Sequence, residues 1–286
     1  MPGAAVERRR DGRSVSFTDA TIWIRRVSVK IRVLGCHGSE QWTAGGRHHH
    51  CCGFLINDTV LLDAGTISSA LTLPEQLTIR DVLLTHVHFD HVQGLPPFAD
   101  NISQDAKEPV AIIGTAETVS GLRSHVFNNV LYPDFFTVPE GRPVFRPRMV
   151  EARQAVRVGG LTVTAIPVNH LVPTVGFLIR EGDRSIVYSG DTYSTEELWR
   201  MASRDTTLKA AFIEPSYPNE MASLALASRH LTPTLLSREV SKLQRPDLPV
   251  YIYHMKPTHA ATIERQLEDL HLPHLRVLTE GQEIVV

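Results

Sequence analysis

The order of apolar and polar residues along the chain first predicts strands. Residues 27–33 alternate apolar with basic side chains, which is the two-residue period of a strand with one buried face. Residues 52–56 and 60–63 are short runs of strand-forming residues, and the pair Asn57-Asp58 between them is typical of a turn. We therefore expect a strand, a loop and a hairpin near the start of the folded chain.

Strands and helices then interleave to the end of the chain. Apolar runs bounded by turn residues predict further strands at residues 81–85, 110–114, 156–158, 162–168, 177–180, 185–189, 210–213 and 250–253. Helices are expected at residues 71–77, 116–122 and 235–243. This interleaving, without a clear linker, predicts a single α/β domain over residues 27–286. Residues 1–26, which begin with a charged, Gly-containing stretch, are expected to form a partly mobile N-terminal extension.

Two segments interrupt this pattern. Residues 125–148 are rich in aromatic residues and proline without a clean period, which predicts an insertion or a lid rather than a core element. Phe127, Tyr132 and Phe135 in this segment are as consistent with stacking on a nucleobase as with closing the segment on itself. Residues 45–50 (G-G-R-H-H-H) are predicted to form a loop that carries three consecutive histidines.

Composition narrows the class of protein. With 286 residues, of which 42% are hydrophobic and 21% charged, the chain can bury a large core, so disordered and coiled-coil proteins are excluded. The 29 basic and 31 acidic residues give a net charge of -2, which argues against general binding to nucleic acid or anionic membranes. We read neither a signal peptide nor a membrane anchor. The number of cysteines is odd, with Cys36, Cys51 and Cys52, and this favours reduced thiols. We therefore expect a cytoplasmic protein.

Histidine is the unusual part of the composition, with 14 residues. One group of histidines lies close together in the sequence. In the run T-H-V-H-F-D-H, the side chains of His86, His88, Asp90 and His91 follow a predicted apolar strand. At a strand exit, His86 and His88 can point to the same side, and the other two follow on the turn. Imidazole and carboxylate suit Zn²⁺, with Mn²⁺ or Fe as alternatives. Without a metal, burying so many polar groups at the end of a strand would be costly.

The motif H-x-H-x-D-H, followed by Gly-Leu, resembles the metallo-β-lactamase superfamily. The resemblance implies an αββα four-layer sandwich, with a site for two divalent metal ions along one sheet edge. It also implies a ligand set at strand ends, which is His86, His88 and His170 for one metal, Asp90, His91 and His254 for the other, and Asp191 shared by both. Asp63 matches a family aspartate that supports the ligand loop.

Three further stretches resemble the class II cyclic-nucleotide phosphodiesterases. They are H-V-F-N-N from residue 125 with the later Y-P-D-F, E-P-S-Y-P-N from residue 214 with the later S-R-H-L-T-P, and H-M-K-P from residue 254. The likeness covers most of the chain from about Val29 onward. It implies hydrolysis of 3′,5′-cyclic nucleotides (cAMP or cGMP) to 5′-nucleotides, with His125, Asn128 and Tyr217 as expected substrate contacts. Phe89 stands where that family usually has leucine, which is equally apolar.

A phosphodiester suits the chemistry of this site. Two cations about 3.5–4 Å apart hold a bridging hydroxide and offset charge on the attacking and leaving oxygens of an in-line displacement. The metals supply no proton for the departing ribose oxygen, and His230 is the expected donor because it resembles the extra histidine of the phosphodiesterases. We expect His230 and Asp90 to act in catalysis. The alternative for His230 is a helix-cap or core histidine.

Other functions share this site. A tRNA 3′-processing endonuclease has the same metal set, but the acidic balance and the lack of a basic, Gly-rich arm argue against it. A lactonase or β-lactamase is a weaker alternative, because such an enzyme does not need the His230 signature. A non-catalytic binding protein is weaker as well, because it does not need seven intact ligands. His48, His49 and His50 are either a third metal point or phosphate contact, or a solvated loop, and the complete ligand set favours the loop. The expected partner is a small phosphodiester, without membrane or nucleic acid, and the resemblance allows a homodimer.

Overall fold

The structure is a computed structural model that describes residues 28–43, 45–46 and 48–286. The predicted N-terminal extension, residues 1–26, lies outside the described residues. Among the helices of the described part, none has both the length and the apolar character that a membrane span requires.

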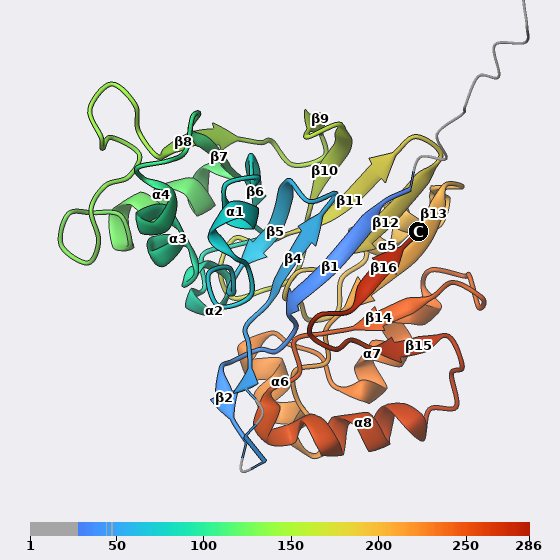
Figure 1. The fold of residues 1–286 in the computed structure, drawn as a ribbon. Coiled ribbons are helices and arrows are strands. Elements are labelled where there is room, and N and C mark those ends of the chain that lie inside the picture. Colours follow the sequence, from blue (N-terminus) through green and yellow to red (C-terminus); the bar gives the residue numbers. More distant parts are fainter. Residues whose placement is uncertain (1–27, 44, 47) are drawn as a thin grey trace, which may run out of the picture.

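Two seven-stranded sheets form the centre of the molecule (Figure 1). The first has the order β16-β1-β4-β5-β6-β7-β8, with β1 (Lys30–Gly35), β4 (Gly53–Ile56), β5 (Val60–Ala64), β6 (Asp81–Leu83), β7 (Val110–Gly114), β8 (Phe145–Met149) and β16 (Glu283–Val285). The second has the order β15-β14-β13-β12-β11-β10-β9, with β9 (Ala155–Val158), β10 (Leu161–Pro167), β11 (Val175–Glu181), β12 (Arg184–Tyr188), β13 (Leu208–Ile213), β14 (Val250–Ile252) and β15 (Leu275–Val277). Every predicted strand is therefore present, and most of them have shifted ends.

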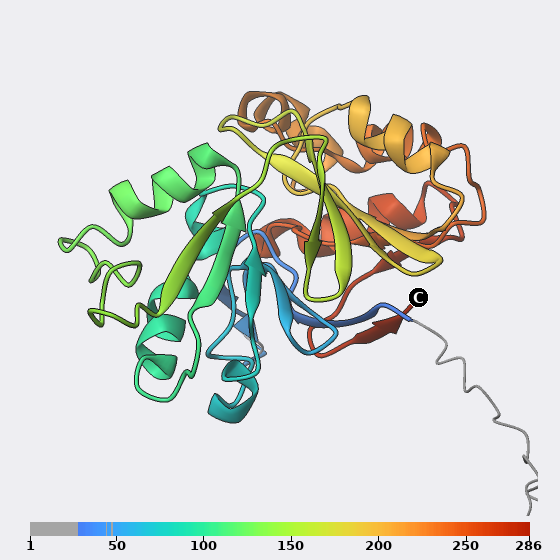
Figure 2. The same cartoon turned by 90° about the horizontal axis from the view of Figure 1, so that it is seen from above.

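Helices cover the outer faces of both sheets, so that the layers run α, β, β, α (Figure 2). Beside the first sheet lie α1 (Leu73–Gln76), α2 (Phe89–Val92), α3 (Leu95–Ile102) and α4 (Ala116–His125). Beside the second lie α5 (Glu197–Arg204), α6 (Ala222–Ser228), α7 (Pro233–Ser241) and α8 (Ala260–Glu268), with the short turns η1 (Asn219–Met221) and η2 (Pro257–His259). This arrangement confirms the αββα sandwich.

Burial follows these layers. Phe54, Phe177 and Phe212 belong to the apolar cluster between the two sheets, where side chains of both sheets alternate inward. Phe98 of α3 lies in the cluster between the first sheet and its helices, and Trp199 of α5 lies in the one between the second sheet and its helices. Each sheet is thus covered on both faces, which leaves the ends of its strands as the places where polar side chains can gather.

Two hairpins lie near the start of the described chain. In the predicted β4–β5 hairpin, Asn57 and Asp58 adopt φ angles of 49° and 58°. Asn and Asp tolerate this left-handed conformation better than other non-glycine residues, so the predicted turn is confirmed. A second hairpin, β2 (Gln41–Trp42) and β3 (His48–His49), forms a separate two-stranded sheet. The prediction that the histidines at 48 and 49 lie in a loop is therefore wrong.

Aromatic residues of the segment between α4 and β8 pack into the core of the molecule. Phe127 is 1% exposed and Phe135 is 6% exposed, and both belong to the cluster between the first sheet and its helices. Tyr132 contacts the ring of Phe127 and hydrogen bonds to Asp100. The prediction that this segment lies outside the core is wrong for these aromatic residues, because they close the segment on itself and are not free to stack on a base.

Replacing Phe127 with alanine tests this packing. The ring contacts Phe136 and Phe145 at centroid distances of 5.7 and 5.5 Å, so its removal leaves a cavity in the core. We expect a loss of about 3–5 kcal/mol in the free energy of unfolding, measured by urea denaturation. Val130→Ala, in the same segment but 91% exposed, is the control and should change stability by less than about 0.5 kcal/mol. Equal effects of the two changes would contradict the packing.

Candidate metal centre

The candidate site lies where strand ends from the two sheets meet. β5 and β6 run parallel in the first sheet, and β12, β13 and β14 run parallel in the second. Parallel strands end at the same edge of a sheet, so the residues at or just after their carboxyl ends gather there. Asp63 and His86 come from the first sheet in this way, and Asp191, Glu214 and His254 come from the second.

One group of predicted ligands comprises His86, His88, His170 and Asp191. One donor atom from each of these residues lies within 4.8 Å of the others. Nε2 of His170 is 3.0 Å from Nδ1 of His88, and Nε2 of His86 is 3.7 Å from Oδ2 of Asp191. Arg229 ends α6 in a left-handed conformation, and its carbonyl oxygen accepts a hydrogen bond from Nδ1 of His170 at 3.1 Å. That bond leaves Nε2 of His170 with its lone pair facing the cluster.

The second group comprises Asp90, His91 and His254. Nε2 of His91 is 3.2 Å from Nε2 of His254, which is itself 3.3 Å from Oδ2 of Asp90. Oδ2 of Asp191 is 3.2 Å from Nε2 of His91 and 3.3 Å from Nε2 of His254. Asp191 therefore faces both groups, and the structure brings all seven predicted ligand side chains together.

Asp63 supports the loop that carries the predicted ligands of the H-x-H-x-D-H motif. It is fully buried, and its carboxylate accepts hydrogen bonds from the backbone N–H and the hydroxyl of Thr85, from Nδ1 of His91 and from the hydroxyl of Tyr188. The bond from His91, at 2.9 Å, leaves the lone pair of His91 on Nε2, toward the ligand group. Asp63 thus sets the orientation of a predicted ligand and links the two sheets, since Tyr188 ends β12.

Asp63→Asn is expected to weaken metal binding by about 10–100-fold, as is typical for a residue that supports a ligand. Asparagine keeps the shape and tolerates the φ of 52°, but its amide nitrogen cannot accept from His91 or Tyr188. Competition with a coloured zinc chelator measures the affinity. Asp58→Asn is the matched control, because Asp58 has a φ of 58° and an exposed side chain. Unchanged affinity in Asp63→Asn would show that the carboxylate does not support the ligand loop.

The residues present fit a divalent cation. Nδ1 of His86 donates to the hydroxyl of Thr85 at 2.9 Å, and Nδ1 of His254 donates to the hydroxyl of Ser216 at 2.9 Å. Each bond directs the Nε2 lone pair of that histidine into the site. Among the described residues, Nε2 of His86 and Oδ1 of Asp191 are buried without any hydrogen-bond partner. Buried lone pairs that face one another are costly unless a cation satisfies them, and imidazole and carboxylate are ligands that zinc accepts.

Burial also favours the metal-binding form of three of the predicted ligand histidines. It lowers the pKa of His86 well below its ordinary value, and it lowers the pKa of His170 to about 4. The pKa of His88 is lowered by burial as well. A neutral imidazole is the form that binds a metal ion, so these three side chains are prepared as ligands at neutral pH.

His230 lies between the two ligand groups. Its ring is edge-on to His170 at 5.0 Å and stacked on His254 at 5.4 Å. Nδ1 of His230 donates to the buried carboxylate of Glu214 at 2.7 Å, which leaves Nε2 as the nitrogen available to a bound molecule. Burial lowers the pKa of His230, but the Glu214 carboxylate outweighs this effect, and the net pKa is raised. This is a positioned histidine rather than a helix cap.

Glu214 also lies at this site, although its sequence context alone assigns it no role. Glu214 belongs to the run E-P-S-Y-P-N. It lies 16 positions from His230, so the sequence does not show that the two side chains pair. Its other oxygen accepts a hydrogen bond from the hydroxyl of Ser216 at 2.9 Å, and Ser216 in turn accepts from His254. Glu214 therefore orients His230 directly and His254 through Ser216.

The three expected substrate contacts lie in different settings. Tyr217 is half-buried, and its ring lies 5.9 Å from that of His230. His125 is exposed at the end of α4. The amide of Asn128 donates to the carbonyl of Ser124 and accepts from two backbone N–H groups of its own turn, so both of its polar groups are already used. Of the three, Tyr217 has a contact with the candidate centre.

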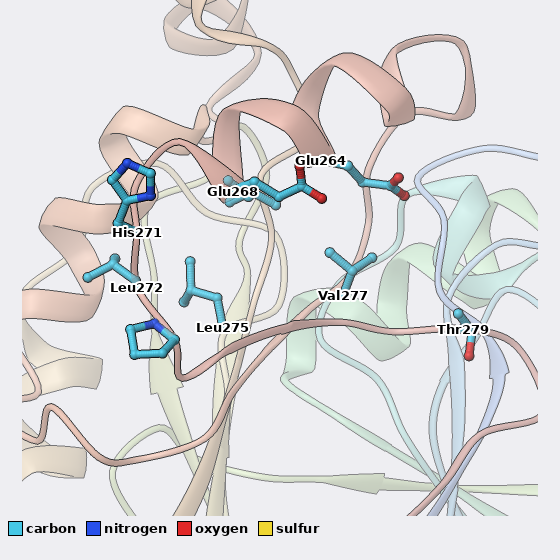
Figure 3. A pocket seen from close by; sticks show the side chains of 9 residues that line it. Glu264, Glu268, His271, Leu272, Leu275, Val277 and Thr279 are labelled. Atoms are coloured by element: carbon cyan, nitrogen blue, oxygen red, sulfur yellow. The ribbon is translucent and has the colours of Figure 1, made fainter.

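A surface cavity of about 630 Å³ lies away from these ligands, between α8 and the edge strand β15. Figure 3 shows Leu272, Leu275 and Val277 along it, with the carboxylates of Glu264 and Glu268 beside them. None of the predicted ligands lines this cavity. It is therefore not part of the metal centre.

Comparison with known families places the chain among proteins with this fold. The model described as "Beta-lactamase superfamily domain" matches residues 58–269. In solved structures, the likeness to unliganded yeast PDE1 has a TM-score of 0.77 at 20% identity and covers 91% of this chain and all of that one. At this level of identity the likeness shows the fold alone.

The curated relatives have names of two kinds. A "Probable 3′,5′-cyclic-nucleotide phosphodiesterase" of Yersinia pestis is 29% identical over 231 residues, which cover 72% of this chain. The chain spans 64% of that relative's own length. A "Ribonuclease Z" of a Mycobacterium species (strain KMS) is 31% identical over 141 residues, which cover 43% of this chain and 46% of the relative. The first likeness thus extends over much more of the chain than the second.

Proposed function

Because this chain belongs to the beta-lactamase superfamily, we propose that it is a metal-dependent phosphodiesterase that hydrolyses 3′,5′-cyclic nucleotides to 5′-nucleotides. The observation that carries the proposal is His230, held by Glu214 between the two ligand groups. A metal centre alone serves many hydrolytic reactions, whereas a proton donor beside it is needed when the leaving group is a poor one such as a ribose oxygen.

The family implies a divalent metal, and we propose zinc with two ions. His86, His88, His170 and Asp191 would hold one ion, and Asp90, His91 and His254, with Asp191 shared, would hold the other. Bound there, the ions would polarise the phosphate oxygens and lower the pKa of the attacking water. Lys256, whose ammonium lies 3.7 Å from Asp90, adds a fixed positive charge beside this carboxylate.

His230 supplies the proton that the leaving oxygen needs. In hydrolysis of a cyclic nucleotide, water attacks phosphorus, the bond from phosphorus to the 3′ oxygen breaks, and that oxygen must gain a proton. Glu214 holds the Nδ1–H of His230 and stabilises its charged form, so that Nε2–H can be given to the departing oxygen. Asp90 is proposed to act in catalysis as well, through its place in the second ligand group.

A small substrate agrees with the charge of the chain. The net charge of -2 gives no general attraction for a polyanion, whereas a cyclic nucleotide carries a single negative charge. The likeness to a ribonuclease Z favours a second candidate, a tRNA 3′-processing activity, over a smaller part of the chain. A lactonase or β-lactamase activity would leave the pairing of His230 with Glu214 unexplained.

Turnover of four substrates by the zinc-loaded protein tests the proposal. The substrates are cAMP, cGMP, bis-p-nitrophenyl phosphate and a precursor tRNA, and the products are separated by chromatography. We expect 5′-nucleotide from at least one cyclic nucleotide. Cleavage of precursor tRNA without cleavage of cAMP or cGMP would replace the proposal by the tRNA-processing activity, and inactivity on all four would reject both.

A further inference from the structure

The candidate metal centre opens to solvent on one side. Four of the seven predicted ligands have at most 1% of their surface exposed, and they are His86, His91, Asp191 and His254. The other three, His88, Asp90 and His170, are partly exposed. A molecule from solvent therefore reaches the centre past these three residues.

Exposed apolar side chains lie next to the partly exposed ligands. Phe89 lies between His88 and Asp90 in the chain, and it is 63% exposed. Leu171 follows His170 and is 59% exposed. The rings of His88 and His170 are 4.9 Å apart. Because neighbouring Cα atoms are only about 3.8 Å apart, Phe89 and Leu171 both lie close to this pair of ligands, at the opening of the centre. We call Phe89 and Leu171 the apolar rim.

The backbone that carries the apolar rim is closely packed. Phe89 is the first residue of α2, and the start of this helix lies so near its neighbours that a Cβ atom on Gly65 would be 2.1 Å from the carbonyl oxygen of Asp90. Leu171 lies in the loop 168–174, which is closed by a hydrogen bond of 3.1 Å from its first N–H to its last carbonyl oxygen. The exposure of both side chains therefore follows from where the backbone places them.

The apolar rim is not part of the core. Neither Phe89 nor Leu171 belongs to any of the three apolar clusters of the described residues. Single exposed apolar side chains are common in proteins, but these two lie together at the opening of a polar centre. Phe127 and Phe135 are packed in the core, so they are not free to contact a bound molecule there. The ring of Phe89 is thus an aromatic face that a ligand of the centre can meet.

We propose that the apolar rim is the binding site for the nucleobase of the substrate, with the base stacked on the ring of Phe89 and in contact with Leu171. The inference rests on the proposed function, which brings the phosphate to the metal centre, and it names the residues that bind the base. Every base has an aromatic face, so stacking favours nucleotides over phosphodiesters without a base and does not distinguish adenine from guanine. The substrate class is therefore a small phosphodiester that carries a base.

The test compares two ligands that differ by the base alone, 5′-AMP and ribose 5-phosphate. Isothermal titration calorimetry of the zinc-loaded full chain gives the Kd of each ligand for the wild type and for Phe89→Ala, Phe89→Leu and Leu171→Ala. The matched control is Val285→Ala, because Val285 is also apolar and 65% exposed but lies on the edge strand β16.

We expect the wild type to bind AMP more tightly than ribose 5-phosphate. Phe89→Ala should raise the Kd for AMP by about 5–150-fold, the range of base stacking on an aromatic side chain, and leave the Kd for ribose 5-phosphate unchanged. Phe89→Leu should lie between the wild type and Phe89→Ala, since leucine keeps an apolar contact without the flat ring. Leu171→Ala should change the same ligand by a smaller factor, and Val285→Ala should change neither.

Three results would overturn the base site. They are wild-type protein that binds AMP no more tightly than ribose 5-phosphate, an unchanged Kd for AMP in Phe89→Ala, and an equal rise in both Kd values in that variant. The last result would make Phe89 a support for the neighbouring ligands, and metal content by mass spectrometry measures that effect directly.

Turnover of cAMP and cGMP by the wild type reports on the proposed function separately. Tighter binding of AMP without hydrolysis of either cyclic nucleotide would reject the proposed function and keep the base site. In an active protein, Phe89→Ala should raise the KM for a cyclic nucleotide and leave kcat nearly unchanged, because the base is bound equally in the ground state and the transition state.

Discussion

Asp191→Asn is expected to reduce phosphodiester turnover by on the order of a thousandfold, together with a loss of bound metal. The substitution keeps the size of the side chain and removes the one negative charge that faces both ligand groups, at 3.2 Å from His91 and 3.7 Å from His86. Metal ions stabilise transition-state charge by several kcal/mol, and each 1.36 kcal/mol is a factor of ten in rate. Loss of that stabilisation accounts for the expected thousandfold fall in turnover.

Two measurements separate this effect from damage to the fold. Steady-state hydrolysis of bis-p-nitrophenyl phosphate gives the rate, and mass spectrometry of the dialysed protein gives the metal content. Asp105→Asn is the matched control, since Asp105 is exposed and distant in sequence from every predicted ligand. If Asp191→Asn retained both its metal and more than a tenth of the activity, Asp191 would not bridge the two groups.

His230→Ala is expected to lower turnover of a cyclic nucleotide by about 10²–10⁴-fold, the range of general acid catalysis. Turnover of bis-p-nitrophenyl phosphate should fall much less, because p-nitrophenolate leaves without a proton. Metal content should stay at the wild-type level. This last point matters because one donor atom of His230 lies within 4.8 Å of donor atoms of Asp191 and His254, so that the residue could also bind metal.

The pattern over two substrates, rather than the size of either loss, identifies the role of His230. The control is His259→Ala, which removes a histidine near Tyr217 that belongs to none of the ligand groups. Loss of metal in His230→Ala would make the residue a ligand. Equal losses on both substrates with full metal content would make it a structural histidine, and either result would remove it as a proton donor.

Glu214→Gln offers a finer measurement of the same pairing. The amide can still accept from Nδ1 of His230, but it no longer stabilises the charged ring. If Glu214 acts through His230, its change should affect the cyclic nucleotide more than bis-p-nitrophenyl phosphate, in the same sense as His230→Ala. Adding the two changes should then cost little more than His230→Ala alone.

Local features made the strands and the family resemblance predictable. Each strand was predictable from a run of three to seven residues, and the H-x-H-x-D-H motif lies within six positions at the end of such a run. The resemblance to the metallo-β-lactamase superfamily and the αββα sandwich are confirmed. The separate roles of the seven ligands stay predictions, which the convergence of their donor atoms supports.

The errors came where local pattern and tertiary packing disagree. The aromatic segment from Phe127 to β8 lacks a period, yet its rings fill the space between the first sheet and its helices. The histidines at 48 and 49 were predicted to lie in a loop, because a strand of two residues is too short to show a period. In both cases the contacts that order the segment come from residues far along the chain.

The sequence by itself determined the ligand types, their order and the strand ends that carry them, because these depend on side-chain chemistry and on a period read over a few residues. Only the tertiary structure decided which of these residues face one another. The pairing of Glu214 with His230, the four bonds of Asp63 and the meeting of His88 and His170 all join segments that chain position does not relate. Sheet pairing and the closure of two sheets over one core set those distances, and neither is recorded in any single stretch of sequence.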